Sequence, residues 1–243
     1  MLYGLVLHQF LRMNPFQPTT QGVNMRKFIN DICGLGAVEF ALVFPIITFL
    51  MLAGFDFGRY LIACQRIEAA SYNIAQMLSQ TQPNVNAIDA GDGIVFDTDI
   101  QWYHNSAMFT FPDVLEVSFQ QQLPWDSLMT VNMTSIKFIP AAGCTSNCTY
   151  TPKVVWSTGN RPCTTVFTQV PDSSVPGPTI LPADLYGPAS QLIVDISYTF
   201  QPTIGAAFLS SISINRTIYM TPRNVSLVET SNSTLAPTCT GAL

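Results

Sequence analysis

The chain has 243 residues, of which 48% are hydrophobic and only 10% are charged. The formal net charge is −5 and the basic residues are scattered, which argues against a nucleic-acid partner, because nucleic-acid-binding proteins cluster Lys and Arg. A mean hydropathy of +0.28 with one long apolar run is typical of a single-pass membrane protein that has one extramembrane domain.

The first 34 residues precede the apolar run and read as a leader. Within residues 1–24 the only charged side chain is Arg12, whereas Met25-Arg26-Lys27-Phe28 has the character of the start of a short basic leader. We therefore expect residues 1–34 to be a leader and residues 1–24 to be an over-called start of translation.

The apolar run contains a carboxylate. Between residues 35 and 57 the only ionisable side chains are Glu39 and Asp56, and a helix of this length, at about 1.5 Å per residue, covers the roughly 30 Å core of a bilayer. An acid in that environment costs a few kcal/mol, so Glu39 is a candidate functional residue. The alternative is an ordinary anchor in which Glu39 reaches back to the membrane surface.

The residues around this acid resemble a known processing signal. Gly34, followed by Glu39 as the fifth residue counted from Leu35, resembles the class III signal of type IV pilin-like proteins, which is cut after the glycine. Residues 36–45 and 55–59 resemble the N-terminal helix of the TadE/TadG-like family of tight-adherence (Flp-type) pilus systems. Glu39 is followed by phenylalanine, where major pilins of this class usually have tyrosine, which favours a minor pseudopilin.

The resemblance implies partners and a location. A prepilin peptidase would cut between Gly34 and Leu35, and the new Leu35 ammonium group would pair with Glu39 during assembly, between neighbouring subunits. The other implied partners are pilins, pseudopilins, the inner-membrane pilus assembly platform and the lipid bilayer. The implied location is the bacterial inner membrane, with the C-terminal domain in the periplasm, or the extracellular pilus after incorporation.

Proline interrupts the apolar helix once. Pro45 cannot donate a hydrogen bond to the Ala41 carbonyl, so we expect a kink there, which membrane helices tolerate. An incidental transmembrane proline is the alternative. Beyond the span, a stripe of packing residues repeats every three or four positions and predicts that the helix continues out of the bilayer to about residue 80. The stripe comprises Tyr60, Cys64, Ile67, Ser71, Ile74 and Leu78.

The rest of the chain predicts a small sheet with further helix. Residues 85–100 are expected to form an acidic loop. Residues 105–122 fit both a helix and a strand, and we expect the helix. Alternation predicts strands over residues 129–138, 153–157, 192–200 and 212–220, the last two antiparallel. In the first of these strands the apolar positions change phase between Met133 and Ile136, which suggests a bulge. Residues 171–178 are expected to be a surface loop.

These elements define an α+β fold. One long N-terminal transmembrane helix, residues 35–80, continues out of the bilayer and packs on a small antiparallel sheet, as the pilin-like resemblance also implies. The extracytoplasmic domain is expected to span residues 81–229, followed by a flexible tail, residues 230–243, that Cys239 tethers.

Four cysteines follow the membrane segment: Cys144, Cys148, Cys163 and Cys239. An even set of this kind favours disulfides in an oxidising compartment. Pairing Cys144 with Cys148 and Cys163 with Cys239 is one of three possible connectivities. A zinc site is the rival interpretation, but its usual added histidines or paired C-x₂-C units are missing, so we expect no metal.

No catalytic arrangement stands out in the sequence. His104 has no partner pattern of the Ser-His-Asp type, and no phosphate-binding loop is present, so we expect neither an enzyme nor a cofactor. The leading hypothesis is a structural minor pilin or pseudopilin that takes part in assembly of a tight-adherence pilus. The alternative is a single-pass membrane glycoprotein or binding protein with an extracellular disulfide-bonded domain, because sequons occur at Asn132, Asn147, Asn215, Asn224 and Asn232. A receptor anchor needs neither Gly34 nor Glu39.

Overall fold

The structure is a computed structural model that describes residues 32–239, except 173, 206–209 and 232–233. It divides into two compact units, Met1–Met51 and Leu52–Leu243, and one helix contributes to both. Most of the expected leader, including Met25 to Asp31, lies outside the described residues.

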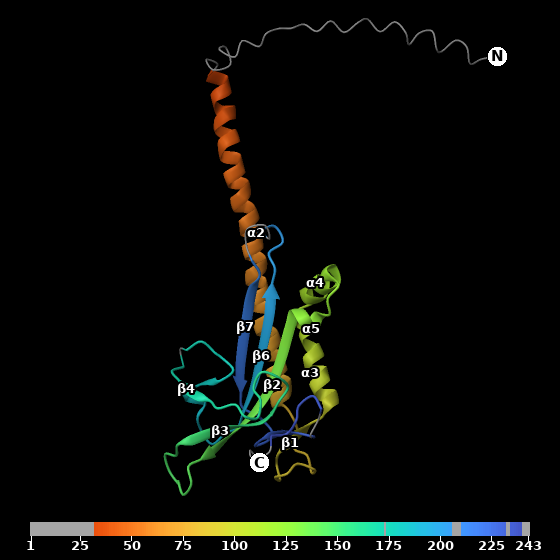
Figure 1. Cartoon of the computed structure of the whole chain (residues 1–243), viewed down its shortest axis with the longest axis vertical. Helices are drawn as coiled ribbons and strands as arrows, with labels where there is room; N and C mark the ends of the chain where they lie inside the picture. The colour runs from red at the N-terminus through yellow and green to blue at the C-terminus, as the bar shows by residue number, and fades with distance from the viewer. Residues whose placement is uncertain (1–31, 173, 206–209, 232–233, 240–243) are drawn as a thin grey trace, which may run out of the picture. The chain divides into compact units, whose positions relative to one another are not determined.

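That helix is α2, Ile32–Ser79 (Figure 1). Among the described residues it is the one helix long and apolar enough to cross a membrane, with a mean hydropathy of 2.2 and no buried residue in its most apolar window. Its large apolar side chains in the first unit are exposed, as Phe40 (65%) and Met51 (76%) illustrate. The helix continues through Pro45, and the kink at that residue stays a prediction.

In the second unit, α2 buries the stripe that the sequence predicts. Ile67, Ser71, Ile74 and Leu78 are fully buried, and Tyr60 and Cys64 are partly buried beside them. The helix ends at Ser79, whose carbonyl accepts a hydrogen bond from the Arg223 N–H. The long helix and the mostly antiparallel sheet described next confirm the α+β class.

Four strands form the main sheet against which α2 packs. They are β2 (Met129–Pro140), β3 (Tyr150–Ser157), β6 (Gln191–Phe200) and β7 (Ile212–Met220). Their order is β3-β2-β6-β7 and every neighbour is antiparallel, so the expected β6–β7 pair is confirmed (Figure 1).

The change of phase in β2 has a different cause from the one we expected. The register does slip between Ser135 and Ile136, but the extra residue is Val155 of β3, and β2 keeps an unbroken register with β6. Met133 packs in the main core, whereas Ile136 belongs to a second core with Phe138, Leu181 and Ile193. Since Leu192 and Ile193 alternate along β6 and belong to different cores, the sheet is buried on both faces here.

A short strand pair covers the second core. It consists of β4 (Thr168–Val170) and β5 (Ile180–Pro182), which pair in parallel, and the 3-10 helix η1 (Ala183–Leu185) follows. The surface loop predicted for residues 171–178 lies between β4 and β5, with residue 173 outside the described part.

Residues 85–100 are not simply a loop. They contain β1 (Gly93–Val95), which pairs in parallel with β8 (Val228–Thr230), and the start of α3 (Asp97–Thr110). A three-residue strand is too short to leave an alternating pattern, and its partner lies far away in the sequence. The loop prediction was therefore wrong over residues 93–95 and 97–100.

The helix predicted over residues 105–122 exists but is broken. Helix α3 ends at Thr110, and α4 (Asp113–Gln121) begins after Pro112, which has no N–H to continue the helix. The short α5 (Trp125–Leu128) leads into β2.

The described part of the tail is attached to the sheet at several points. The Cys239 N–H donates to the Val155 carbonyl at 2.7 Å, Ala236 is fully buried, and the backbone of Thr238 bridges to Trp156. Residues 238 and 239 are thus tied to β3 through their backbone, in addition to the bond that the Cys239 sulfur makes with Cys163.

Candidate functional site

The residues of the expected processing signal lie on one helix. Gly34, Leu35 and Glu39 all belong to α2, and residues four apart in a helix share a face, so the backbone places Leu35 and Glu39 on the same side. Glu39 is exposed. Gly34 lies within α2, although glycine is a poor helix former.

The surface around Glu39 is a continuous apolar one. Phe40 and Phe44, one turn apart, place their ring centroids 5.4 Å from each other, and both are more than half exposed. Soluble monomers rarely expose apolar patches of this extent, so the first unit requires cover from lipid tails or from other apolar helices.

The second acid of the apolar run has a different environment. Asp56 is only 5% exposed, although its neighbours Phe55 and Phe57 are about 60% exposed. Its carboxylate accepts the backbone N–H groups of the residues after β6: Oδ1 from Thr203 at 3.2 Å, and Oδ2 from Ile204 at 3.1 Å and from Gly205 at 2.6 Å. Asp56 therefore faces the extramembrane domain and fixes the end of β6 to α2.

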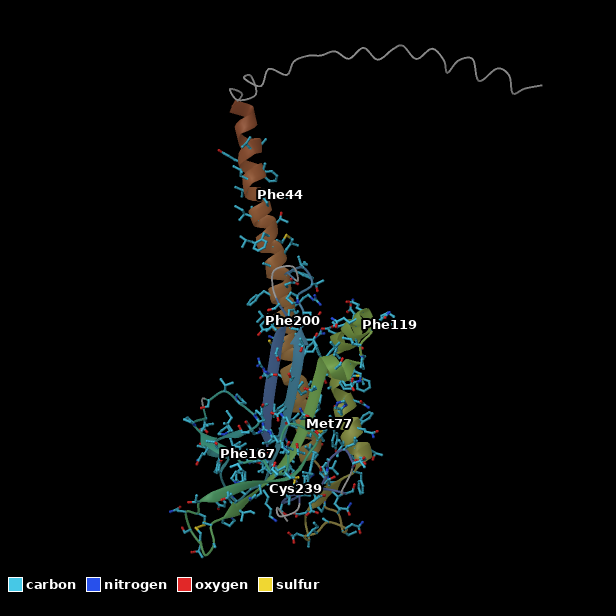
Figure 2. All side chains as sticks on the ribbon, in the orientation of Figure 1. Phe44, Met77, Phe119, Phe167, Phe200 and Cys239 are labelled. Atoms are coloured by element: carbon cyan, nitrogen blue, oxygen red, sulfur yellow. A yellow bond between two sulfur atoms is a disulfide. The ribbon has the colours of Figure 1, made fainter. Side chains whose placement is uncertain are left out.

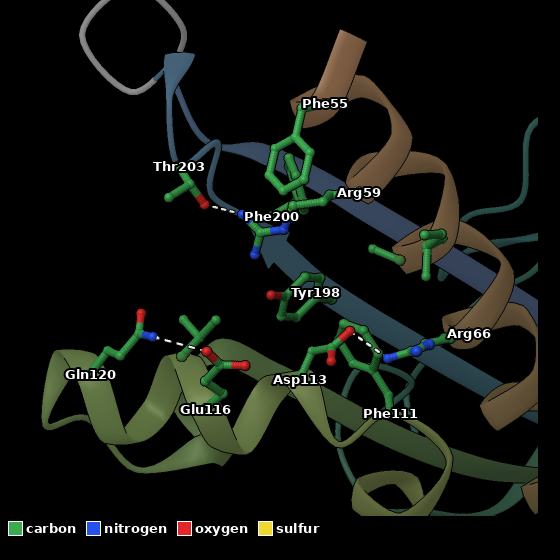
Figure 3. Close-up of a pocket in the computed structure, with 13 residues that line it drawn as sticks. Phe55, Arg59, Arg66, Phe111, Asp113, Glu116, Gln120, Tyr198, Phe200 and Thr203 are labelled. Carbon is green, nitrogen blue, oxygen red and sulfur yellow. Dashed lines mark hydrogen bonds and ion pairs between the residues drawn. The ribbon is translucent and has the colours of Figure 1, made fainter. Parts of the chain in front are cut away.

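A groove of about 430 Å³ lies beside this contact within the second unit (Figure 3). Helix α2 forms one wall with Phe55, Arg59 and Ile62, α4 forms the other with Glu116 and Gln120, and Tyr198 and Phe200 at the end of β6 form the floor. The groove thus combines an aromatic floor with walls that carry both apolar and polar side chains.

One ion pair and one hydrogen bond link the residues at the two ends of this groove. Arg66 donates to the Asp113 carboxylate, and Arg59 donates to the Thr203 hydroxyl (Figure 3). Burial raises the pKa of the Tyr198 phenol, and the nearby Asp113 carboxylate adds to this effect, so Tyr198 stays neutral at ordinary pH. Both arginines of the groove are thus held by side chains of its opposite wall or of the segment after β6.

The segment Phe55–Arg59 is part of the family resemblance, but the sequence analysis predicts no hydrogen-bond partner for Asp56. An acid between two phenylalanines at the end of an apolar run was the available signal, because such an acid needs hydrogen-bond donors nearby. The Arg66–Asp113 pair left no signal of this kind, since the two residues are far apart in the sequence and are joined only by the packing of α4.

Replacing Asp56 with alanine is expected to free the end of β6 from α2. The three backbone N–H groups lose their acceptor, which costs about 2–3 kcal/mol for groups in a partly buried site. Amide hydrogen exchange at Ile204 and Gly205 in the full chain should become faster. The matched variant Asp56→Asn keeps one acceptor oxygen and should show a smaller effect; equal exchange in Asp56→Ala and the wild type would contradict the role of Asp56.

The cysteines form two disulfides, Cys144–Cys148 and Cys163–Cys239. Cys64 is a free, partly buried thiol on α2. Within the part of the chain that the structure describes, no cluster of three or more His, Cys, Asp or Glu side chains could hold a metal ion.

The fold and the exposed helix define a class: an α+β protein with one candidate membrane anchor. Residues 34–76 match the model of the family described as TadE-like protein, so the anchor and its continuation are TadE-like. The family is a structural, pilus-related one, and the match covers α2 but not the sheet. No curated protein and no solved structure matches the chain.

Proposed function

We propose that this chain is a minor pilin, or pseudopilin, that takes part in assembly of a tight-adherence (Flp-type) pilus. The observation that supports it most directly is the TadE-like segment itself, in which Gly34, Leu35 and Glu39 share a helix with an exposed apolar surface. Its role is structural and not catalytic.

The proposed location is the bacterial inner membrane, with the second unit in the periplasm until the protein is incorporated into a pilus. The disulfides Cys144–Cys148 and Cys163–Cys239 support this orientation, because disulfides persist in the periplasm and are rare in the cytosol. The proposed partners are a prepilin peptidase, other pilins and pseudopilins, the assembly platform of the inner membrane and the lipid bilayer.

A membrane glycoprotein or binding protein remains a less favoured alternative. Its sequons at Asn147, Asn215 and Asn224 are exposed, which makes them accessible, but triplets of this type are frequent in chains rich in Ser and Thr. It also gives no role to Gly34 and Glu39.

Cleavage is the decisive test of the proposal. We expect a prepilin peptidase to cut the chain between Gly34 and Leu35 when the two proteins are expressed together. Intact-mass analysis and N-terminal sequencing should then find Leu35 as the first residue, and Gly34→Leu should block the cut. A chain that keeps its leader in the presence of an active peptidase would contradict the proposal.

Glu39→Ala is expected to leave membrane insertion intact and to impair pilus assembly. Removing a charge makes insertion easier, but the ammonium group at Leu35 then lacks its partner. Glu39→Gln, which keeps the size of the side chain, should behave like Glu39→Ala, and Glu39→Asp should keep part of the function. Counting pili by electron microscopy in cells that carry only the variant measures the effect; normal pili with Glu39→Gln would favour the plain-anchor interpretation.

A further inference from the structure

One apolar surface of the second unit faces away from the domain and has no part in the main core. It lies on α4 and just beyond it, and consists of Leu115 (44% exposed), Phe119 (87%) and Leu123 (46%). We call these three residues the α4 apolar face. Figure 2 shows Phe119 on α4 with its side chain directed away from the sheet.

Helix α4 carries apolar side chains on two sides, one that faces the domain and one that faces outward. Val114 is fully buried and Val117 packs against the main core, which accounts for the inner side. Leu115 and Phe119 are four residues apart and therefore share the outer side. Glu116 and Gln120 lie between these two sides, where they line the groove.

The contacts of α4 place this face near the end of the apolar part of α2. The first residue of α4, Asp113, pairs with Arg66, and the last, Gln121, donates to the Gln201 side chain at 2.7 Å. Gln201 directly follows β6 and lies two residues before Thr203, whose N–H binds Asp56. Figure 1 shows α4 at the end of the domain where β6 ends.

That end of the domain is where α2 leaves its apolar run. Phe55, Phe57 and Ile62 are exposed apolar side chains on α2, with 58%, 61% and 47% exposure. Phe55 and Ile62 also line the groove that α4 closes on its other side. Exposed apolar side chains therefore occur on both helices that flank the groove, on α2 and on α4.

We propose that the α4 apolar face rests in the lipid surface of the same bilayer that anchors α2. This inference depends on the membrane anchor of the proposed function, but not on pilus assembly. Interfacial helices bury their apolar side roughly 5–10 Å into the boundary between headgroups and acyl chains, a depth that Phe119 and its two neighbours suit. Two attachments, α2 and α4, would then fix the orientation of the domain on the membrane.

The chemistry of the face favours neutral lipid. Residues 113–128 carry Asp113, Glu116 and Asp126 but no Lys or Arg, so attraction to anionic headgroups cannot drive the contact. A second copy of the chain is a poorer occupant, because a stable protein interface buries about 800 Å² on each partner and three side chains supply only a small part of that area.

The test measures the depth of single labelled positions in the full chain, reconstituted in phosphatidylcholine vesicles. A Cys33→Ser/Cys64→Ser background leaves the two disulfides in place, and a fluorophore is attached at Phe119→Cys. Leu50→Cys serves as the reference within the span, and Val85→Cys, fully exposed and beyond the far end of α2, serves as the matched control. Lipids that carry a nitroxide group then quench the fluorescence of any label that lies in the bilayer.

We expect quenching at residues 50 and 119 and none at residue 85, with the label at 119 quenched more by nitroxides near the headgroups than by nitroxides deep in the acyl chains. Adding anionic lipid should not increase this quenching. Quenching at 50 without quenching at 119 would overturn the α4 inference and leave the anchor standing. No quenching at 50 would overturn both. A label at 119 that is shielded from nitroxides only at high protein density would assign the face to a second copy.

Discussion

Arg161→Met is expected to lower the free energy of unfolding of the extramembrane unit by about 3–5 kcal/mol, because the change leaves a buried carboxylate without its cation. Arg161 is fully buried, and its Nε and Nη2 donate to the two oxygens of Asp195 at 2.9 and 3.0 Å. Its Nη1 also donates to the carbonyls of Gly177 and Pro178. The variant would thus remove the hydrogen bonds that hold the loop before β5. It would also leave the Asp195 carboxylate, in the middle of β6, without a cationic partner.

Asp195 has other hydrogen-bond donors, and these reduce the loss of stability. Asn160 Nδ2 and the Thr217 hydroxyl both bind its carboxylate, at 3.0 and 2.6 Å. Two neutral donors solvate a buried anion less well than a guanidinium does, so the loss stays large.

Urea unfolding of the full chain in detergent micelles, followed by the fluorescence of the buried Trp156, measures the effect. Arg216→Met is the matched control, because Arg216 pairs with Glu68 at 4.0 Å on the surface and should change stability by less than about 1 kcal/mol. The double variant Arg161→Met/Asp195→Leu should recover part of the loss, since it removes both buried charges. Equal stability of Arg161→Met and Arg216→Met would contradict the assigned role.

Local pattern was sufficient for the longest elements of the fold. The stripe from Tyr60 to Leu78 predicted the continuation of α2, and the alternation over residues 192–200 predicted β6, because every second residue of β6 from Leu192 to Phe200, like the stripe of α2, packs in the main core. The helical period of α2 and the two-residue period of β6 are therefore visible in the sequence.

The failures arise where packing comes from distant segments. The three-residue β1 exists only because β8, from the other end of the chain, pairs with it. The phase change in β2 reflects a second core built by Leu181 and Ile193, which no local pattern of β2 could reveal. Similarly, Asp56 is explained only by the backbone N–H groups of residues 203–205.

The candidate site divides in the same way. The sequence alone indicated Gly34, Leu35 and Glu39, since a motif needs only spacing along the chain. The groove beside Asp56 and the α4 apolar face needed the fold, because Arg66 meets Asp113, and Phe119 turns outward, only after Pro112 has broken the helix. The structure thus adds the α4 apolar face, for which we propose a contact with lipid, to the residues that the motif defines.

Loss of the Cys163–Cys239 disulfide is expected to destabilise the second unit by roughly 4 kcal/mol in the chain-entropy model, because the bond closes a loop with a sequence separation of 76 residues. Cys239 is 3% exposed, and its N–H binds β3 at Val155, so a free tail would also give up this packing. The Trp156 indole, which donates to the Val228 carbonyl at 2.8 Å, would lose its cover in the same step.

The double variant Cys163→Ser/Cys239→Ser tests this without a reductant, and Cys144→Ser/Cys148→Ser is its matched control. The control bond spans a sequence separation of only 4, so the same model gives it about 2 kcal/mol, and it lies at the exposed tip between β2 and β3. Thermal unfolding of the full chain in micelles should therefore show a much larger drop in Tm for the first pair than for the second. If the two pairs lower Tm equally, neither the longer loop closed by Cys163–Cys239 nor the packing of the tail on β3 stabilises the second unit as expected, and this prediction is wrong.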